Sequence, residues 1–446
     1  MRRVSSRFVF DHIQHNEEDR TYTFSYIVEF ADGTSETYRE QIQFPRQLEA
    51  VNASSHPAVH LAFQSLHLML GISYWKLYCP RDMHLNGFTL TKHQADFWNT
   101  VYTKGLGEFF YKNHIDYHEL VQFPHENKKE FAAQSRELPT RALLPLGGGK
   151  DSLVSAEMLK TRHILFDVWV TNPHPLHTNL TQHIGAPFYE VHRTLDPKLF
   201  DVIKSGKAYD GHVPMTAIHS FIYLTSAVLF GYNAVVLSNE KSASYGNVEY
   251  LGETINHQWS KSEEFEHLLQ AYVEQYIAKD LKIFSLLRPY YEIEIARRFV
   301  ETGRVYFPYF SSCNRNFSYR GSKNPEGKLW CGECPKCAFV FALLAAFLPK
   351  TEVVQIFGKD LYADAKLLPT YRELLSLINV KPFECVGTPE ETAVAFSRAR
   401  MRKEFTGEPA MTLFEHEATP KFSHPAPLEK ELFSSHPAPN IPKECV

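Results

Sequence analysis

The sequence of 446 residues has no long basic run, no signal-peptide pattern and no apolar run that would span a membrane. Its longest apolar stretch, Ala338 to Leu348, falls well short of the ~20 residues that a transmembrane helix needs. The N-terminal segment MRRVSSRFVFDH carries arginines but lacks the apolar core of a signal peptide. We therefore expect a cytoplasmic protein that does not enter a membrane.

The charge balance argues against a nucleic-acid partner. The formal net charge is −4 at pH 7, and no basic stripe supplies the electrostatic footprint that phosphate backbones attract. A hydrophobic content of 44% with 22% charged residues is ordinary for a globular protein. Because a chain of this length exceeds one typical core, we expect at least two domains. The sequence does not indicate an oligomeric state.

Cysteine is scarce, and most of it is concentrated in one segment. Of seven cysteines, Cys313, Cys331, Cys334 and Cys337 lie within 25 positions, whereas Cys79, Cys385 and Cys445 are scattered. In a reducing compartment such clustering favours metal over disulfides. Four thiolates with two-residue spacings predict a closed structural Zn²⁺ site. A three-cysteine iron–sulfur ligand set and free structural cysteines remain alternatives.

A Walker A motif is absent from the most distinctive stretch, LLPLGGGKDSLVSAEML, because Lys150 is followed by aspartate. The four apolar residues from Leu143 predict a short buried strand, and an amphipathic helix follows the glycines. Such a turn can bind phosphate, because glycines let the backbone approach the anion closely and the helix N-terminus attracts negative charge. Asp151 beside phosphates indicates an intervening Mg²⁺ ion. The predicted cradle residues are Gly147, Gly148, Gly149, Lys150, Asp151 and Ser152. A glycine-rich turn without a ligand is the alternative.

Two folding units are predicted around this loop. Residues 1–125 combine alternating strands and helical patterns over Ala58 to Leu70 and Lys92 to Tyr111, as expected for an α+β domain. Residues 126–141 are charged and flanked by proline, which is typical of a linker. Residues 142–380 alternate apolar strands and helices, so we expect a doubly wound parallel α/β sheet with a four-cysteine insertion. Ligands then bind at the carboxyl ends of the strands.

Residues 381–446 are expected to contain one helix, Thr388 to Phe405, and a proline-rich disordered tail with two SHPAP copies.

Polar side chains follow the predicted strand Val235 to Leu237. Glu240 and Lys241 come directly after it, and His257 lies in a second polar segment. Each segment alone is more typical of a solvated loop, but the position after a strand favours a site beside the glycine loop. His257 is a candidate proton-transfer group. Arg288 is expected either to meet an anionic substrate or to pair with a carboxylate.

The glycine loop resembles the SGGxDS signature of the PP-loop ATP pyrophosphatases, with Gly147 in place of the leading serine. The later C…CxxCxxC pattern is similar to that of 7-cyano-7-deazaguanine synthase, a shorter PP-loop enzyme. Longer segments resemble the UDP-N-acetyl-α-D-muramoyl-L-alanyl-L-glutamate epimerase family: GISYWK, PLGGGKDSLV, GHVPMTAIHS, SNEKSAS, INHQWSKSEEFE and CGECPKCAFVFA.

This resemblance implies an ATP-dependent epimerase of peptidoglycan precursor synthesis. It would adenylate the terminal L-Glu of UDP-MurNAc-L-Ala-L-Glu, invert the Cα and release AMP and diphosphate. The expected cofactors are ATP, Mg²⁺ and structural Zn²⁺. Glu240, Lys241 and His257 would bind the substrate carboxylate and transfer protons, and Lys150 or Lys241 would face the enolate. A nucleobase-modifying PP-loop ligase and a non-catalytic zinc-bearing binding module remain alternatives.

Overall fold

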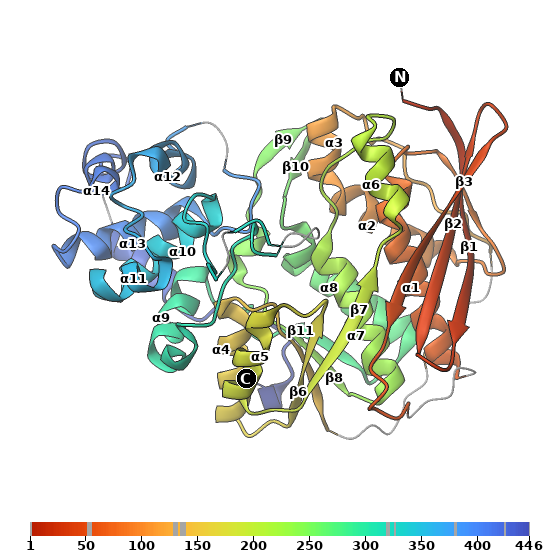
Figure 1. Ribbon diagram of the computed structural model, residues 1–446, viewed down its shortest axis with the longest axis horizontal. Coiled ribbons are helices and arrows are strands. Elements are labelled where there is room, and N and C mark those ends of the chain that lie inside the picture. The colour runs from red at the N-terminus through yellow and green to blue at the C-terminus, as the bar shows by residue number, and fades with distance from the viewer. Residues whose placement is uncertain are drawn as a thin grey trace.

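The computed structural model describes residues 2–50, 56–127, 133, 140–317, 322–324, 327–378, 381–422 and 425–445. Within these ranges a nine-stranded sheet runs through the molecule in the order β11-β8-β5-β6-β7-β3-β2-β1-β4 (Figure 1). A separate two-stranded ribbon pairs β9 (Val248–Tyr250) with β10 (Glu253–Ile255). Most of the predicted linker lies outside the described residues.

Five neighbouring strands of the large sheet are parallel, as predicted from the alternating pattern. They are β5 (Ala142–Pro145), β6 (Phe166–Thr171), β7 (Phe188–Thr194), β8 (Ala234–Leu237) and β11 (Lys282–Ser285). From β5 the chain steps outward through β6 to β7, then returns to β8 on the other side and continues to β11. The connections therefore reverse direction between β5 and β8, and ligands bind at such a switch point in open α/β sheets.

The N-terminal strands extend the same sheet. They are β1 (Ser5–Asn16), β2 (Thr21–Phe30) and β3 (Ser35–Gln43), which are antiparallel, and β4 (Asp82–Leu85), which is parallel to β1. Strand β3 pairs with β7, with Ile42 opposite Arg193. The sheet thus crosses the boundary expected near residue 125, because β3 satisfies the free edge of β7.

Helices cover both faces of the parallel strands, whereas β1 to β3 are covered by helices on one face only (Figure 1). In chain order they are α1 (Pro57–Trp75), α2 (Lys92–Gly105), α3 (Gly107–Asn113), α4 (Lys150–Thr161), α5 (Pro175–Ile184), α6 (Pro197–Lys204), α7 (Met215–Phe230), α8 (Glu263–Tyr272), α9 (Glu292–Thr302), α10 (Pro335–Ala345), α11 (Lys350–Phe357), α12 (Leu368–Leu374), α13 (Pro389–Met401), α14 (Pro409–Leu413) and α15 (Pro425–Leu432). The predicted helix at 92–111 is divided into α2 and α3 near Gly105.

Two hydrophobic cores lie on opposite faces of the parallel strands. Leu143 and Val235 belong to the core with α1, α2, α7 and α8. Their neighbours Leu144 and Val236 belong to the core with α4, α5, α9 and α10. Successive strand side chains point to opposite faces, so continuously apolar strands fill both cores.

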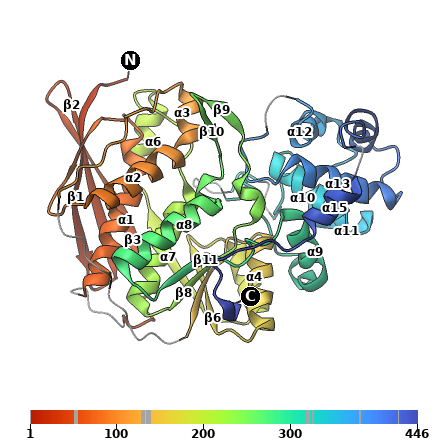
Figure 2. The same cartoon turned by 180° about the vertical axis from the view of Figure 1, so that it is seen from behind.

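Helices α9 to α14 form a group on the side of the molecule away from β1 to β3 (Figures 1 and 2). The predicted helix at 388–405 is present as α13, with a capping box at Thr388. The expectation of a disordered tail is wrong for many of its described residues, which form α14 and α15. Apolar side chains explain this: Met411, Leu413 and Phe414 are buried against the helical group.

Within the ranges described above, no helix is both long and apolar enough to cross a bilayer.

Helix α1 continues five residues beyond the predicted Leu70 and passes close to β1. A Cβ on Gly71 would lie 2.4 Å from Cε1 of the buried Phe10 ring, so only glycine permits this approach. We predict that Gly71→Ala lowers the free energy of unfolding by about 1–3 kcal/mol, because the Phe10 ring must move in a packed core. Urea unfolding measures the effect, and a Phe10→Leu background should reduce it. Alanine has the higher helix propensity, so a higher free energy of unfolding for Gly71→Ala would contradict the close contact with Phe10.

Candidate functional site

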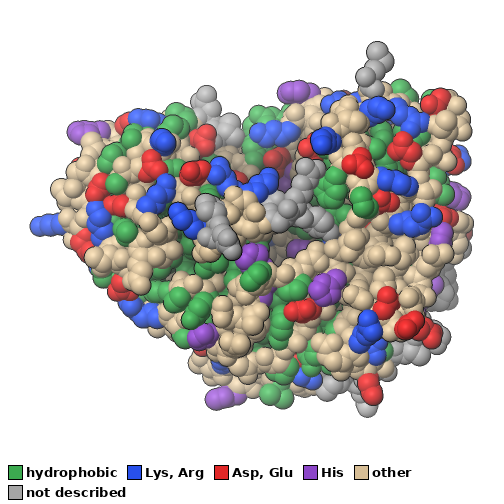
Figure 3. Space-filling view, in the orientation of Figure 1, with side chains coloured by type: hydrophobic (Ala, Val, Ile, Leu, Met, Phe, Trp, Pro, Cys, Tyr) green, Lys and Arg blue, Asp and Glu red, His purple; other side chains and the backbone are tan. Residues whose placement is uncertain are grey.

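A cavity of about 380 Å³ opens at the carboxyl ends of β5 and β8, at the switch point of the sheet. From the glycine loop it is lined by Gly147, Gly149, Asp151 and Ser152. After β8 come Leu237, Ser238 and Asn239, and the remaining walls include Thr216, His219, Tyr223, Lys261, Ser312, Asn314, Phe317, Lys336 and Cys385. Figure 3 shows a hollow near the centre of this face, with histidine and basic side chains around it.

The glycine loop has the backbone geometry of an anion cradle. Gly148 has φ +90°, and a Cβ there would lie 2.7 Å from Leu176, so glycine is required. Gly149 caps α4 without a side-chain hydrogen bond to the first turn, which leaves helix N–H groups for a ligand. A Cβ on Gly147 would meet nothing within 4 Å. The serine of the PP-loop signature would therefore fit at this position.

Lys150 lies beneath the loop in a buried charge cluster. Its ammonium donates to Asp151 and to the fully buried Glu292 at the start of α9. Lys336 on α10 lies 3.3 Å from the same Glu292 carboxylate. Burial alone would raise the pKa of Glu292, but Lys150 and Lys336 lower it to about 2. The ammonium of Lys150, which the sequence places among the predicted cradle residues, is thus held by protein carboxylates.

Lys261 and Lys336 bring positive charge to the cavity wall. Burial disfavours the charged form of Lys261, but Cys385 and Glu240 raise its pKa above the ordinary value. No ion pair of the Lys261 ammonium is found among the described residues. An anion entering the cavity would therefore meet two cations and the N-terminus of α4.

The expected residues after β8 separate in space. Asn239 lines the cavity, and Glu240 is 1% exposed with neither carboxylate oxygen hydrogen-bonded among the described residues. Lys241 points toward the Tyr291 ring and is not part of the cavity wall. Arg288 is buried against Glu266 at 2.8 Å and donates to the Glu240 carbonyl, so the structure favours its pairing role.

His257 lies between a carboxylate and a thiol. Its Nδ1 is 2.5 Å from Oε2 of Glu108 on α3, and its Nε2 is 4.0 Å from Sγ of Cys385. Nδ1 of His212 is 3.3 Å from the same Glu108 oxygen. Burial lowers the pKa of His257, but its hydrogen bonds to Cys385 and Glu108 raise it to about 9. The sequence did not reveal this group, because Glu108, His212, His257 and Cys385 come from four separate segments of the chain.

A second cavity of about 400 Å³ adjoins the first through Gly147, His219, Tyr223 and Phe317. It continues along the carboxyl ends of β6 and β7, where Thr171 and Arg193 line it. Burial lowers the pKa of His219 to about 4, so this imidazole is neutral near pH 7. Together the two cavities offer an elongated site across four parallel strands.

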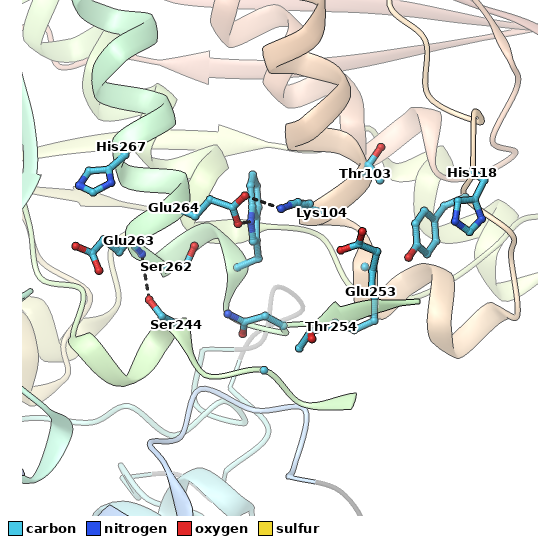
Figure 4. A pocket seen from close by; sticks show the side chains of 16 residues that line it. Thr103, Lys104, His118, Ser244, Glu253, Thr254, Ser262, Glu263, Glu264 and His267 are labelled. Carbon is cyan, nitrogen blue, oxygen red and sulfur yellow. Dashed lines mark hydrogen bonds and ion pairs between the residues drawn. The ribbon is translucent and has the colours of Figure 1, made fainter. Parts of the chain in front are cut away.

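A larger pocket of about 800 Å³ lies beside α2, α8 and the β9–β10 ribbon. Figure 4 shows Lys104 pointing to Glu264, whose carboxylate is 2.5 Å from the ammonium. Glu253 and Glu263 add further negative charge on the wall. This acidic balance is poorly suited to a polyphosphate, and the pocket lies away from the glycine loop.

The four clustered cysteines converge as predicted. Their sulfur atoms all lie within 4.8 Å of one another, and Sγ of Cys337 is 3.5 Å from Sγ of both Cys331 and Cys334. All four are free thiols. A tetrahedral ion with Zn–S bonds of ~2.3 Å separates its sulfurs by roughly 3.8 Å, so the donor set fits zinc.

The segment that leads into Cys313 contacts the glycine loop. Ser311 lies two residues before Cys313, and its backbone N–H donates to the Gly148 carbonyl at 2.9 Å. The neighbouring Ser312 also packs closely on the loop, because a Cβ added to Gly149 would lie 3.1 Å from the Cβ of Ser312. Cys334 and Cys337 flank Lys336, which lines the cavity. The cluster is therefore placed to hold two walls of the cavity together.

We predict that Glu292→Gln lowers the free energy of unfolding by about 3–5 kcal/mol at pH 7, because Lys150 then lies buried beside a neutral group. The folded-state pKa of Glu292 lies below its ordinary 4.5, so its ionised form stabilises the protein above that pH. This contribution is lost as pH falls toward 2. Chemical unfolding at several pH values should show that the free energy of unfolding falls less steeply with acid in the variant than in the wild type. The same pH dependence in both proteins would contradict the ion pair.

Comparisons with known proteins match nearly the whole chain. Residues 1–286 match the MurL N-terminal domain, and residues 309–427 match the MurL C-terminal domain. A protein of Xanthomonas oryzae is 39% identical over 86% of this chain and 84% of its own length. A second protein, from a Micromonospora strain, is 36% identical over 94% of this chain and 92% of its own length. Both carry the name UDP-N-acetyl-alpha-D-muramoyl-L-alanyl-L-glutamate epimerase. The chain therefore belongs to the MurL family.

Proposed function

We propose that this protein is an ATP-dependent epimerase that converts the terminal L-Glu of UDP-MurNAc-L-Ala-L-Glu to D-Glu. The names of its relatives support the substrate and the reaction class. The glycine loop at the switch point, facing two lysines, is the observation that supports ATP use. The products would be AMP and diphosphate, and the substrate is a nucleotide-sugar peptide of peptidoglycan precursor synthesis.

The ATP site of this proposal is a PP-loop site. Backbone N–H groups from Gly147 to Gly149 and the hydroxyl of Ser152 hold the triphosphate at the N-terminus of α4. Lys261 and Lys336 balance its charge from the facing wall. Mg²⁺ bound by Asp151 would screen the phosphates from this carboxylate. The neighbouring cavity along β6 and β7 leaves room for the acyl substrate.

Adenylation explains why an epimerase would consume ATP. A free α-carboxylate is negative, and loss of the adjacent Cα proton would place more charge beside it. In the proposed reaction a carboxylate oxygen attacks the α-phosphorus, and the bond to the β-phosphate oxygen breaks with release of diphosphate. The resulting acyl carbonyl accepts the electron pair of the broken Cα–H bond as an enolate. Reprotonation on the other face and hydrolysis then give the D product and AMP.

The residues that would transfer protons are constrained by their positions. His257 is held by Glu108 within reach of the cavity residue Cys385, which supports a role in proton transfer. Glu240 lies behind the wall near Lys261 and supports that cation electrostatically. Lys261 takes over the role expected of Lys241 as the cation that faces the enolate, because it lines the cavity and Lys241 does not.

The four-cysteine cluster would hold structural Zn²⁺. Four thiolates leave no open coordination position, so the ion would contribute folding free energy without taking part in the reaction. Its ligands connect the loop at Cys313 to the start of α10.

The relatives' names favour the epimerase over both alternatives. A nucleobase-modifying ligase would share the ATP chemistry but act on a purine-like carboxylate. A zinc-bearing binding module would not turn over ATP.

Incubation with ATP-Mg²⁺ in D₂O tests the proposal, with UDP-MurNAc-L-Ala-L-Glu and 7-carboxy-7-deazaguanine as separate substrates. We expect AMP and diphosphate only with the first, and deuterium at the glutamate Cα. Asp151→Asn should abolish AMP release while circular dichroism stays unchanged. AMP release with the deazapurine alone would indicate a nucleobase-modifying enzyme. No AMP release with either substrate would contradict ATP-dependent catalysis.

We predict that Cys334→Ser loses bound metal and lowers the melting temperature, because structural zinc contributes folding free energy. Metal analysis and thermal unfolding measure both effects, and Cys445→Ser serves as a control outside the cluster. Since Cys313 supports the glycine loop, ATP affinity should fall with the metal content. Full metal content with an unchanged melting temperature would contradict the zinc site.

A further inference from the structure

We infer that Cys385, oriented by His257 and Glu108, is the group that removes or returns the Cα proton of the substrate glutamate. This inference rests on the proposed function and goes beyond it by identifying the proton-transfer thiol. No motif distinguishes Cys385, which stands alone in its segment of the sequence. Its significance comes from the side chains that the fold brings around it.

The geometry is that of a thiol–imidazole–carboxylate relay. Cys385 lines the 380 Å³ cavity together with Asp151 and Gly149 of the glycine loop. Behind it, His257 presents Nε2 to the sulfur at 4.0 Å and Nδ1 to the Glu108 carboxylate at 2.5 Å. A carboxylate in this position orients the imidazole and stabilises its protonated form.

Several segments hold the relay. The backbone N–H of His257 donates to Asn247 Oδ1 at 2.8 Å, and Gln258 donates to the Val386 carbonyl next to Cys385 at 2.9 Å. Glu108 sits at the start of α3 and also lies 3.3 Å from Nδ1 of His212. These contacts fix the imidazole and the cysteine segment relative to one another.

The charges around Cys385 favour a thiolate. Burial raises the pKa of this thiol, but Lys261, His257 and Lys336 lower it to about 7. Since the pKa of His257 is about 9, a substantial fraction of the pair is thiolate and imidazolium at neutral pH. Cys79 provides the contrast within the same chain, because burial raises its pKa to about 12. Reactive cysteines lie in such electropositive, accessible surroundings, whereas structural ones are protonated.

The proposed step conserves atoms and electrons. The Cys385 thiolate takes the Cα proton, so the C–H bond breaks and an S–H bond forms. The C–H electron pair moves to the acyl carbonyl oxygen, giving an enolate that is stabilised by Lys261, which lines the same cavity. A proton from water is added to the opposite face of the Cα, and the thiol returns its proton to water. The nearby imidazolium then stabilises the regenerated thiolate.

The test separates adenylation from proton transfer in the full-length protein. Cys385→Ser and Cys385→Ala are compared with Cys79→Ser, with UDP-MurNAc-L-Ala-L-Glu and ATP-Mg²⁺ in D₂O. We expect both Cys385 variants to release AMP but to lose Cα deuterium incorporation by about 10²–10⁴-fold, the usual contribution of a positioned acid–base group. Cys79→Ser should retain both activities.

A second measurement reports the thiolate without catalysis. Iodoacetamide alkylation, followed residue by residue with mass spectrometry, should give Cys385 a midpoint near pH 7. His257→Asn should raise this midpoint, because it removes the imidazolium and its hydrogen bond. An unchanged midpoint in His257→Asn would overturn the relay.

The outcomes distinguish the two proposals. If the wild-type protein releases AMP and the Cys385 variants incorporate deuterium at the wild-type rate, the assignment of Cys385 is wrong and the epimerase proposal stands. If the wild-type protein releases no AMP with this substrate, both proposals fail together.

Discussion

The buried carboxylate of Glu292 is the point on which the site depends. It accepts from Lys150 under the glycine loop and lies 3.3 Å from Lys336 on α10. The backbone N–H of Glu292 also donates a hydrogen bond to the hydroxyl of Ser242, which follows β8. One residue thus connects the glycine loop, helix α10 with its Cys337, and the segment after β8. Because a buried charge without a partner costs several kcal/mol, these elements are constrained to stay together.

The cysteine cluster reinforces this arrangement from the other side of the loop. Ser311, two residues before Cys313, bonds to the Gly148 carbonyl, while Lys336 lies between Cys334 and Cys337. Metal binding at the cluster would therefore act on the cavity through two short connections. In the proposed function, zinc would contribute only indirectly, by holding the glycine loop and the wall with Lys336 at a fixed separation.

The extended sheet explains the contribution of the N-terminal part of the chain. Strand β3 pairs with β7, and Glu40 on β3 forms a buried ion pair with Arg193 at 2.6 Å. Arg193 also lines the second cavity. Helix α3, from the same part of the chain, supplies Glu108 to His257. The N-terminal segment thus shapes the site directly, although its sequence carries no recognisable chemistry.

Elements with a local physical cause could be predicted from the sequence. Apolar strands, the strand–glycine–helix order around Gly148 and the CxxCxxC spacing predicted the parallel strands, the loop and the cysteine cluster, because neighbouring residues supply the physical reason. The continuous sheet, the burial of Lys150 and the proximity of Glu108, His257 and Cys385 arise only when the whole chain folds. These depend on strand pairing and on electrostatic interactions between segments more than 100 residues apart, which no local pattern encodes.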